Sequence, residues 1–216
     1  MDTEWSAIRT GDASASDMLK RTTSGGNGLA SSARNLARDP GTIYTDFRKA
    51  MRRLTSTVSI IATVGDGDYV GMVATTVNSL CCDPPAIVAC VSRAASIFGP
   101  LMSCKRFSVN LLEARQANLI AIFSGQEKGA ARFRHGQWED IDGLPCLVDG
   151  QATLLCRLDG SFAYGSHDVI VGRIEAARVA DQISPLLWQN GKPAVSRALD
   201  QDRGTGTPHT TSSHGR

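Results

Sequence analysis

The most informative stretch of the sequence is Gly71–Pro85, GMVATTVNSLCCDPP, which runs directly into the apolar segment Ala86–Val91, AIVACV. It begins with a glycine, continues with small and hydroxylated residues, and stops at Asp83-Pro84-Pro85. Small side chains let a flat ring approach the backbone of a strand, and hydroxyl and amide groups hydrogen-bond to ring carbonyls or phosphate oxygens. The same composition is also typical of a threonine-rich edge strand. The residues alone leave both interpretations open.

Strand signals surround this stretch. Thr57–Val64 is a β-branched run, and the turn Gly65-Asp66-Gly67-Asp68 leads from it into a strand expected over Tyr69–Ser79, so the two form a hairpin. Four more strands are expected, and a loop over Asp159–His167 joins the last two. These strands are Ala86–Ser92, Phe107–Leu112, Gln151–Leu158 and Asp168–Val179. Neither βαβ alternation nor a Gly-x-Gly-x-x-Gly turn occurs, so the pattern favours a closed antiparallel barrel over a parallel nucleotide-binding sheet.

Two short helices are also predicted. The first follows Thr45, a suitable N-cap, and repeats apolar residues at helical spacing at Phe47, Ala50, Met51 and Leu54. Its other face is basic, with Arg48, Lys49, Arg52 and Arg53; it is either simply solvated or in contact with a nucleotide phosphate. The second helix is expected over Glu113–Phe123 and should stop at Gly125.

Composition bounds the class of protein. The 216 residues include 23 basic and 21 acidic ones, too balanced to imply a nucleic-acid surface. None of the six cysteines is in a CxxC pair, which favours reduced thiols over disulfides or metal ligands, so no metal site is expected. The N-terminus, MDTEWSAIRTGD, is not typical of a secretory signal, and no apolar run is long enough to span a bilayer. We expect a cytoplasmic protein without nucleic-acid or membrane partners.

The ends of the chain differ from its middle. Residues 1–41 and 197–216 are rich in small and polar residues with little apolar periodicity, so both are expected to be disordered tails. Between them, residues 42–196 are expected to form one domain.

The ordered set of motifs resembles the flavin reductase-like family, the FMN-binding split barrels. That family carries a Gly-Met-x-Ala-Ser/Thr-Ser/Thr-x-x-Ser-x-x-x-Asp-Pro-Pro string, and nine positions of this chain match it: Gly71, Met72, Ala74, Thr75, Thr76, Ser79, Asp83, Pro84 and Pro85. Further matched segments follow in order over roughly residues 44–193, including CVSR at 90–93, FSVNL at 107–111, GLPCL at 143–147 and GSHD at 165–168.

The resemblance implies a mainly β fold, an antiparallel Greek-key split barrel with a few peripheral helices. It also implies FMN, or FAD, bound in a groove between two subunits of a homodimer, and hydride transfer from NADH or NADPH to flavin N5. The reduced flavin would supply a partner flavin-dependent monooxygenase. A split barrel that binds flavin or haem without reductase turnover is the alternative. The apolar residues expected at the dimer interface are Leu80, Ile97, Phe98 and Leu101.

The resemblance also suggests which residues form the site. Those expected to bind the flavin or the nicotinamide nucleotide are Ala74, Thr75, Thr76, Asn78, Ser79, Ser92, Arg93, Lys105, Arg132 and Phe133. The threonines suit the flavin's polar edge or ribityl chain, and Asn78 and Ser79 suit the pyrimidine-side carbonyls or ribityl hydroxyls. Ser92 and Arg93 suit the phosphate, with a surface ion pair as the alternative for the arginine.

His167 is the expected catalytic residue. It stands in GSHD, where the family usually has Gly-Asp-His before a strand, and the resemblance implies that it faces the nicotinamide or flavin. Ser166 replaces the usual acid, which removes a charge that could tether the imidazole. An ordinary turn histidine is the alternative.

Overall fold

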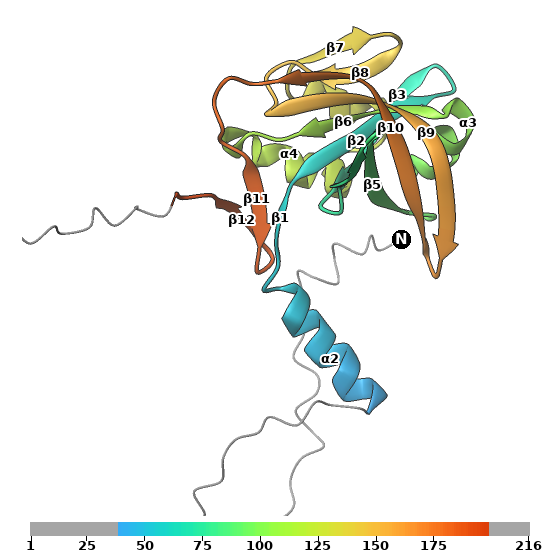
Figure 1. Cartoon of the computed structure of the whole chain (residues 1–216). Coiled ribbons are helices and arrows are strands. Elements are labelled where there is room, and N and C mark those ends of the chain that lie inside the picture. Colours follow the sequence, from blue (N-terminus) through green and yellow to red (C-terminus); the bar gives the residue numbers. More distant parts are fainter. Residues whose placement is uncertain (1–38, 199–216) are drawn as a thin grey trace, which may run out of the picture.

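A computed structural model of the chain describes residues 39–198 (Figure 1). The two expected tails, residues 1–41 and 197–216, therefore lie almost entirely outside the described residues.

A seven-stranded antiparallel sheet forms the body of the molecule (Figure 1), with the strand order β3-β2-β6-β9-β10-β5-β4. Its strands are β2 (Ser59–Gly65), β3 (Asp68–Ala74), β4 (Asn78–Cys82), β5 (Pro85–Ser92), β6 (Arg106–Leu111), β9 (Ala152–Tyr164) and β10 (His167–Val179). Strands far apart in the chain lie side by side, as β2 and β6 or β5 and β10 do, which needs the long connections typical of Greek-key folds. The mainly β, antiparallel class is confirmed.

The barrel closure that the sequence pattern favours is not seen in the part of the chain that the structure describes. The edge strands β3 and β4 follow each other in the chain, yet no ladder of hydrogen bonds joins them within residues 39–198. The expected single strand Tyr69–Ser79 is interrupted over 75–77, where the chain leaves β3 on one edge and enters β4 on the other. This interruption lets one continuous stretch serve both edges of an open sheet.

Smaller elements surround the sheet. The helical ones are α2 (Pro40–Met51), α3 (Phe98–Cys104), η1 (Ala114–Gln116), α4 (Asn118–Ala121), η2 (Ile122–Gln126) and η3 (Gly129–Arg134). A second sheet has the order β1-β11-β12, and a hairpin pairs β7 with β8. These strands are β1 (Thr55–Thr57), β7 (Trp138–Ile141), β8 (Leu144–Leu147), β11 (Leu186–Gln189) and β12 (Lys192–Val195). The helix expected over Glu113–Phe123 is thus divided among three short turns.

The first helix begins earlier than the sequence predicted. Its N-cap is Asp39, whose carboxylate accepts hydrogen bonds from the backbone and the hydroxyl of Thr42, and Pro40 occupies the first turn. Thr45 lies inside the helix, where its hydroxyl donates to the carbonyl of Gly41. A carboxylate followed by proline is the stronger start signal, so the expected cap at Thr45 is wrong.

The loop expected over Asp159–His167 is also wrong, because β9 and β10 extend through most of it. They form one long hairpin closed at Gly165 and Ser166, and Gly165 takes a positive φ of 55°. The glycines and serines of this segment suggested a loop. In the structure these residues alternate between the two faces of the β9–β10 hairpin.

Two hydrophobic clusters lie on opposite sides of β2. Ile60 packs with α4, η2 and β8 residues such as Leu119, Phe123 and Leu147, whereas Ile61 packs with the cluster that contains Phe107, Val109, Leu101 and Ile170. Adjacent strand residues point to opposite faces, so a continuous apolar run serves both clusters.

Candidate functional site

Three neighbouring strands share one face that the rest of the described chain covers only in part. The register places three rows of residues across β5, β10 and β9: Ser92, His167, Tyr164; Cys90, Val169, Phe162; and Val88, Val171, Gly160. Paired residues and residues two apart lie on the same face of a sheet, so these nine form one surface, here termed the open face. Most are half-buried, while Phe162 and Tyr164 are 65% and 75% exposed.

The opposite face of the same strands is core. Val91, Asp168 and Ile170 alternate with open-face residues and are buried. Gly160 lies at one corner of the open face, and a Cβ added there would meet no atom of the described chain within 4 Å apart from its two chain neighbours, so there is space over this corner. A surface with valines on β5 and β10 and aromatic side chains along one border suits a planar ring.

The hydroxylated stretch lies along the border of this face. The Thr76 hydroxyl accepts from the Cys90 backbone N–H at 3.2 Å and also lies 3.4 Å from the Cys90 carbonyl, so it continues the β4–β5 ladder into the interruption. Asn78 is paired with Val88, which puts it on the open-face side, whereas Ser79 is paired with the buried Ile87 and so has the opposite direction.

Two other residues of this stretch have different surroundings. Thr75 is half-buried within the interruption. Ala74 ends β3 with 4% exposure and packs in the cluster around Ile61. The structure therefore brings Thr76 and Asn78 to the open face and assigns Ala74 to the core.

His167 lies in the row at the end of the open face. It is the first residue of β10, paired with Ser92 on one side and Tyr164 on the other. The Ser166 hydroxyl lies 2.9 Å from His167 Nδ1, donating or accepting according to the tautomer. A serine therefore supplies a tether where the family usually has an acid.

Arg93 forms an ion pair, the alternative that the sequence had left open. Its Nε donates to Asp168 Oδ1 at 2.6 Å, and its backbone N–H donates to the Ser166 carbonyl at 3.0 Å. The arginine side chain is 43% exposed and the aspartate 11%. Asp168 is not among the expected site residues, although its place directly after His167 at a strand start puts it on the other face.

Arg132 and Phe133 serve packing. Arg132 Nη1 donates to the Gly71 carbonyl at 2.6 Å and Nε to the Glu127 carbonyl at 2.9 Å, and burial lowers the pKa of this guanidinium. Phe133 belongs to an aromatic cluster with Tyr69, Phe123 and Trp138, at centroid distances of 5.4, 5.2 and 4.9 Å.

The same aromatic cluster explains why residue 71 is a glycine. A Cβ there would approach ring carbons of Phe123 and Phe133 to 3.1 Å and the Ile61 carbonyl to 3.3 Å. The small residue that opens the family-like string therefore makes room for aromatic rings of the chain itself. Lys105 is the left-handed, exposed residue that ends α3, and its carbonyl accepts from the Leu158 N–H.

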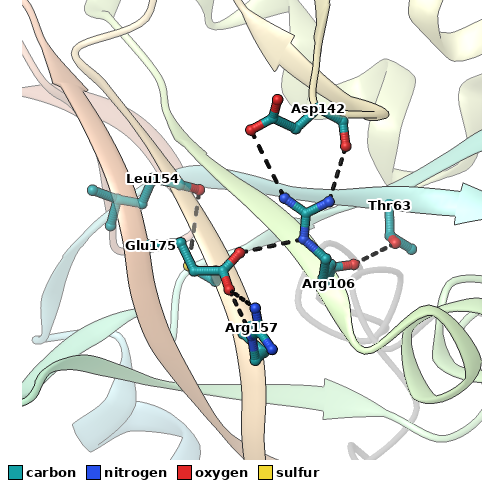
Figure 2. A network of polar contacts seen from close by, with 7 residues as sticks. Thr63, Arg106, Asp142, Leu154, Arg157 and Glu175 are labelled. Atoms are coloured by element: carbon teal, nitrogen blue, oxygen red, sulfur yellow. Dashed lines mark hydrogen bonds and ion pairs between the residues drawn. The ribbon is translucent and has the colours of Figure 1, made fainter.

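A polar network ties the other end of β10 to its neighbours (Figure 2). Glu175 accepts from Arg157 Nε at 2.6 Å and from Arg106 Nε at 3.3 Å, and Arg106 Nη1 also donates to the Asp142 carbonyl. The bond from Arg157, reinforced by Arg106, lowers the pKa of Glu175. These opposite charges pair with one another, so the network has a structural role. It is termed the arginine clasp and consists of Arg106, Asp142, Arg157 and Glu175.

A surface cavity of about 370 Å³ lies elsewhere, between Glu113, the 148–151 turn and the 178–184 segment. Its Arg115 is paired with Glu113 and Asp149, and none of the expected site residues lines it. Within residues 39–198 no group of three His, Cys, Asp or Glu residues is placed to hold a metal ion. Among the same residues, no helix has the length and apolar character to cross a membrane.

Comparisons with known proteins point to the same family as the ordered motifs of the sequence. The family model described as "Flavin reductase like domain" matches residues 51–195. The reductase component of the FADH(2)-dependent resorcinol hydroxylase of Rhizobium sp. (strain MTP-10005) is 34% identical over 161 residues, 73% of this chain and 89% of that protein. The FMN reductase (NADH) RutF of Methylorubrum populi is 36% identical over 143 residues, 66% of this chain and 71% of that protein.

A solved structure shows the same fold. The flavin reductase HpaC complexed with NADP+ is 29% identical and superposes with a TM-score of 0.65, covering 72% of this chain and 99% of that one. The resemblance seen in the motifs is thus confirmed. The chain belongs to the flavin reductase-like family of oxidoreductases.

Proposed function

We propose that this protein catalyses the reduction of a flavin by NADH or NADPH, with the open face as the surface against which the flavin ring lies. The open face carries the proposal, because its valines on β5 and β10 lie beside hydrogen-bonding groups and exposed aromatic side chains. Relatives named FMN reductase (NADH) support FMN and NADH as the first pair to test. Bound flavin would supply the hydride-accepting N5.

The chain's own residues would hold and orient two rings. Val169 and Val171 would support the apolar ring system, and the Thr76 and Ser92 hydroxyls and the Asn78 amide would bond its polar parts. Arg93 would contact a phosphate, since Nε is occupied by Asp168 and the terminal nitrogens have no hydrogen-bond partner among residues 39–198.

His167 would lie on the nicotinamide side. Replacing His167 with Ala should raise the KM for the nicotinamide nucleotide and leave flavin affinity within about twofold, because the ring is at the border of the open face. Steady-state kinetics and a flavin titration on the same preparation measure both quantities. Unchanged kinetic constants would contradict this role and would mean that His167 is an ordinary turn residue.

We further propose a homodimer, in which a second copy covers surfaces that one copy leaves exposed. Phe162 and Tyr164 on the open face are exposed, and so are five apolar residues along α2 and just after it: Ile43, Tyr44, Phe47, Met51 and Leu54. In Figure 1 this helix stands away from the sheet, and an isolated helix of twelve residues is marginal in water, so it needs a partner.

The structure corrects the interface residues expected from the sequence. Ile97 and Leu101 are fully buried in the core, while Leu80 on β4 is exposed and stays a candidate. Light scattering with flavin present should give twice the chain mass at micromolar concentration, and a monomer there would contradict the dimer.

We also propose that the protein is cytoplasmic and that its partner is a flavin-dependent monooxygenase. The Rhizobium relative is named as the reductase component of a hydroxylase, which supports release of reduced flavin to a flavin-dependent monooxygenase. All six cysteines lie among residues 39–198 and are free thiols, which fits a cytoplasmic protein.

One assay separates this function from the alternative, a protein that binds flavin or haem without turnover. Purified protein should oxidise NADH or NADPH in air only when FMN, FAD or riboflavin is added, and the comparison of both nicotinamides and three flavins fixes the preference. Flavin binding without nicotinamide oxidation would support the binding protein instead.

A further inference from the structure

Arg93 and Asp168 form a fixed unit at the end of β5 and β10. Asp168 is the second residue of β10, is buried, and is paired with Val91 on the inner face of the sheet. Its carboxylate receives Arg93 Nε at 2.6 Å. A carboxylate this buried next to one exposed arginine fixes the guanidinium at a defined place.

The backbone around Arg93 is fixed as well. Its N–H bonds to the Ser166 carbonyl, and the following turn is closed by the bond from the Ala95 N–H to the Ser92 carbonyl. The Ser92 hydroxyl also accepts from the Ala94 N–H at 3.3 Å. The segment that carries Arg93 is therefore tied both to β10 and to itself.

We propose that Asp168 is a positioning residue, which holds Arg93 by Nε so that its two terminal nitrogens bind a nucleotide phosphate at the end of β5 and β10. The inference rests on the proposed function and adds to it the residue that orients the phosphate contact. Arginine binds phosphate through a planar set of donors, so its orientation decides how many bonds form. The carboxylate offsets the arginine charge, so the unit acts through directed hydrogen bonds more than through long-range attraction.

The phosphate can belong to the flavin or to the nicotinamide nucleotide, and ligands that lack it distinguish the two. Riboflavin is FMN without phosphate, and dihydronicotinamide riboside is the reduced nicotinamide without phosphate. Binding of FMN and riboflavin to the full-length protein is measured by flavin fluorescence, without nicotinamide present. KM values for NADH and the riboside are measured separately.

Two substitutions of Asp168 separate orientation from charge. In Asp168→Asn the amide oxygen still accepts Nε–H, so binding should stay within about threefold of wild type, whereas Asp168→Ala should lower FMN affinity about tenfold or more. Riboflavin affinity should stay within about twofold in both. If the nicotinamide phosphates are bound instead, the same pattern appears in the KM for NADH, with the riboside and both flavins unaffected. Either pattern supports the proposal.

The matched control is Glu175→Gln, which removes an arginine-paired carboxylate on the same strand outside the open face. It should leave all four ligands within about twofold. Should Asp168→Ala fail to fold in a thermal melt, Arg93→Lys keeps the charge but loses the planar donors, and it should show the same selective loss.

Equal loss for ligands with and without phosphate would overturn the proposal, as would tighter FMN binding in both Asp168 variants or no change in any ligand. The proposed function can fail separately. A wild-type protein that binds FMN more tightly than riboflavin, loses that preference in Asp168→Ala, and oxidises no nicotinamide would keep the inference and refute the reductase.

Discussion

The aromatic cluster around Phe133 and the aromatic border of the open face contain the same kinds of residue in opposite surroundings. In the cluster, Phe133 contacts three other rings, Arg132 bonds two carbonyls, and Gly71 makes room for the rings. On the open face, Phe162 and Tyr164 are exposed, and Gly160 has free space where a side chain would be. The type of residue therefore does not identify a candidate site. Exposed side chains and free space around them do.

The same contrast holds for the arginines. Arg106 and Arg157 share Glu175 in a clasp that also reaches Asp142, and these groups satisfy one another (Figure 2). Arg93 has one buried partner and keeps two terminal nitrogens without a partner among residues 39–198. The structure thus favours Arg93 over Arg132 as a ligand contact.

The largest expected effect on stability comes from removing one aromatic ring, either from the buried cluster or from the border of the open face. Phe133→Ala should lower the free energy of unfolding by about 2–4 kcal/mol, somewhat below the range for a fully buried phenylalanine. Phe162→Ala should change the intrinsic stability of one copy by at most about 0.5 kcal/mol, because the side chain is exposed. Denaturant unfolding at two protein concentrations measures both.

Concentration dependence is the control. Loss of stability in Phe133→Ala should be the same at both concentrations, whereas any loss in Phe162→Ala should depend on concentration, since it would act through the dimer. An equal, concentration-independent loss in both variants would show that Phe162 packs within its own copy.

A smaller effect is expected at the two glycines. Gly71→Ala should cost about 1–3 kcal/mol, because the new methyl would meet two rings and a carbonyl in a filled space. Gly160→Ala should change stability by less than about 0.5 kcal/mol but weaken FMN binding severalfold, because the methyl projects into the space over that corner of the open face. Thermal unfolding and an FMN titration test the pair, and unchanged FMN affinity in Gly160→Ala would remove the open face from the site.

Much of the fold was predictable, because its signals are local. The turn at Gly65-Asp66-Gly67-Asp68 and the β-branched run before it predicted the hairpin that β2 and β3 form. The long β9–β10 hairpin was missed because Gly160, Ser161 and Gly165 are typical of loops, although Phe162 and Tyr164 have the spacing of one strand face.

The site was less predictable, because partners lie far apart in the chain. Arg93 and Asp168 are 75 residues apart, and nothing in the sequence says which acid meets which arginine. Arg132 and Phe133 match the family's composition, but only the packing shows that they are already satisfied. His167 and the hydroxylated stretch were proposed for the site because the motif order indicated them.

The smallest expected effect tests the satisfied arginine clasp through pH. Two arginines lower the pKa of Glu175 below its usual value of 4.5, so the folded state holds the carboxylate charged more strongly than the unfolded state does. The stabilisation is therefore fully present above pH 4.5 and is lost as pH falls through the lower, folded-state pKa. Glu175→Gln should lower stability by less than about 1 kcal/mol at pH 7, since the pair is partly exposed, and the difference from wild type should shrink below pH 4.5. Denaturant unfolding between pH 3 and pH 7 measures the difference, and flavin affinity at pH 7 should be unchanged. A difference that stays constant across this range would mean that Glu175 contributes through packing and not through its charge.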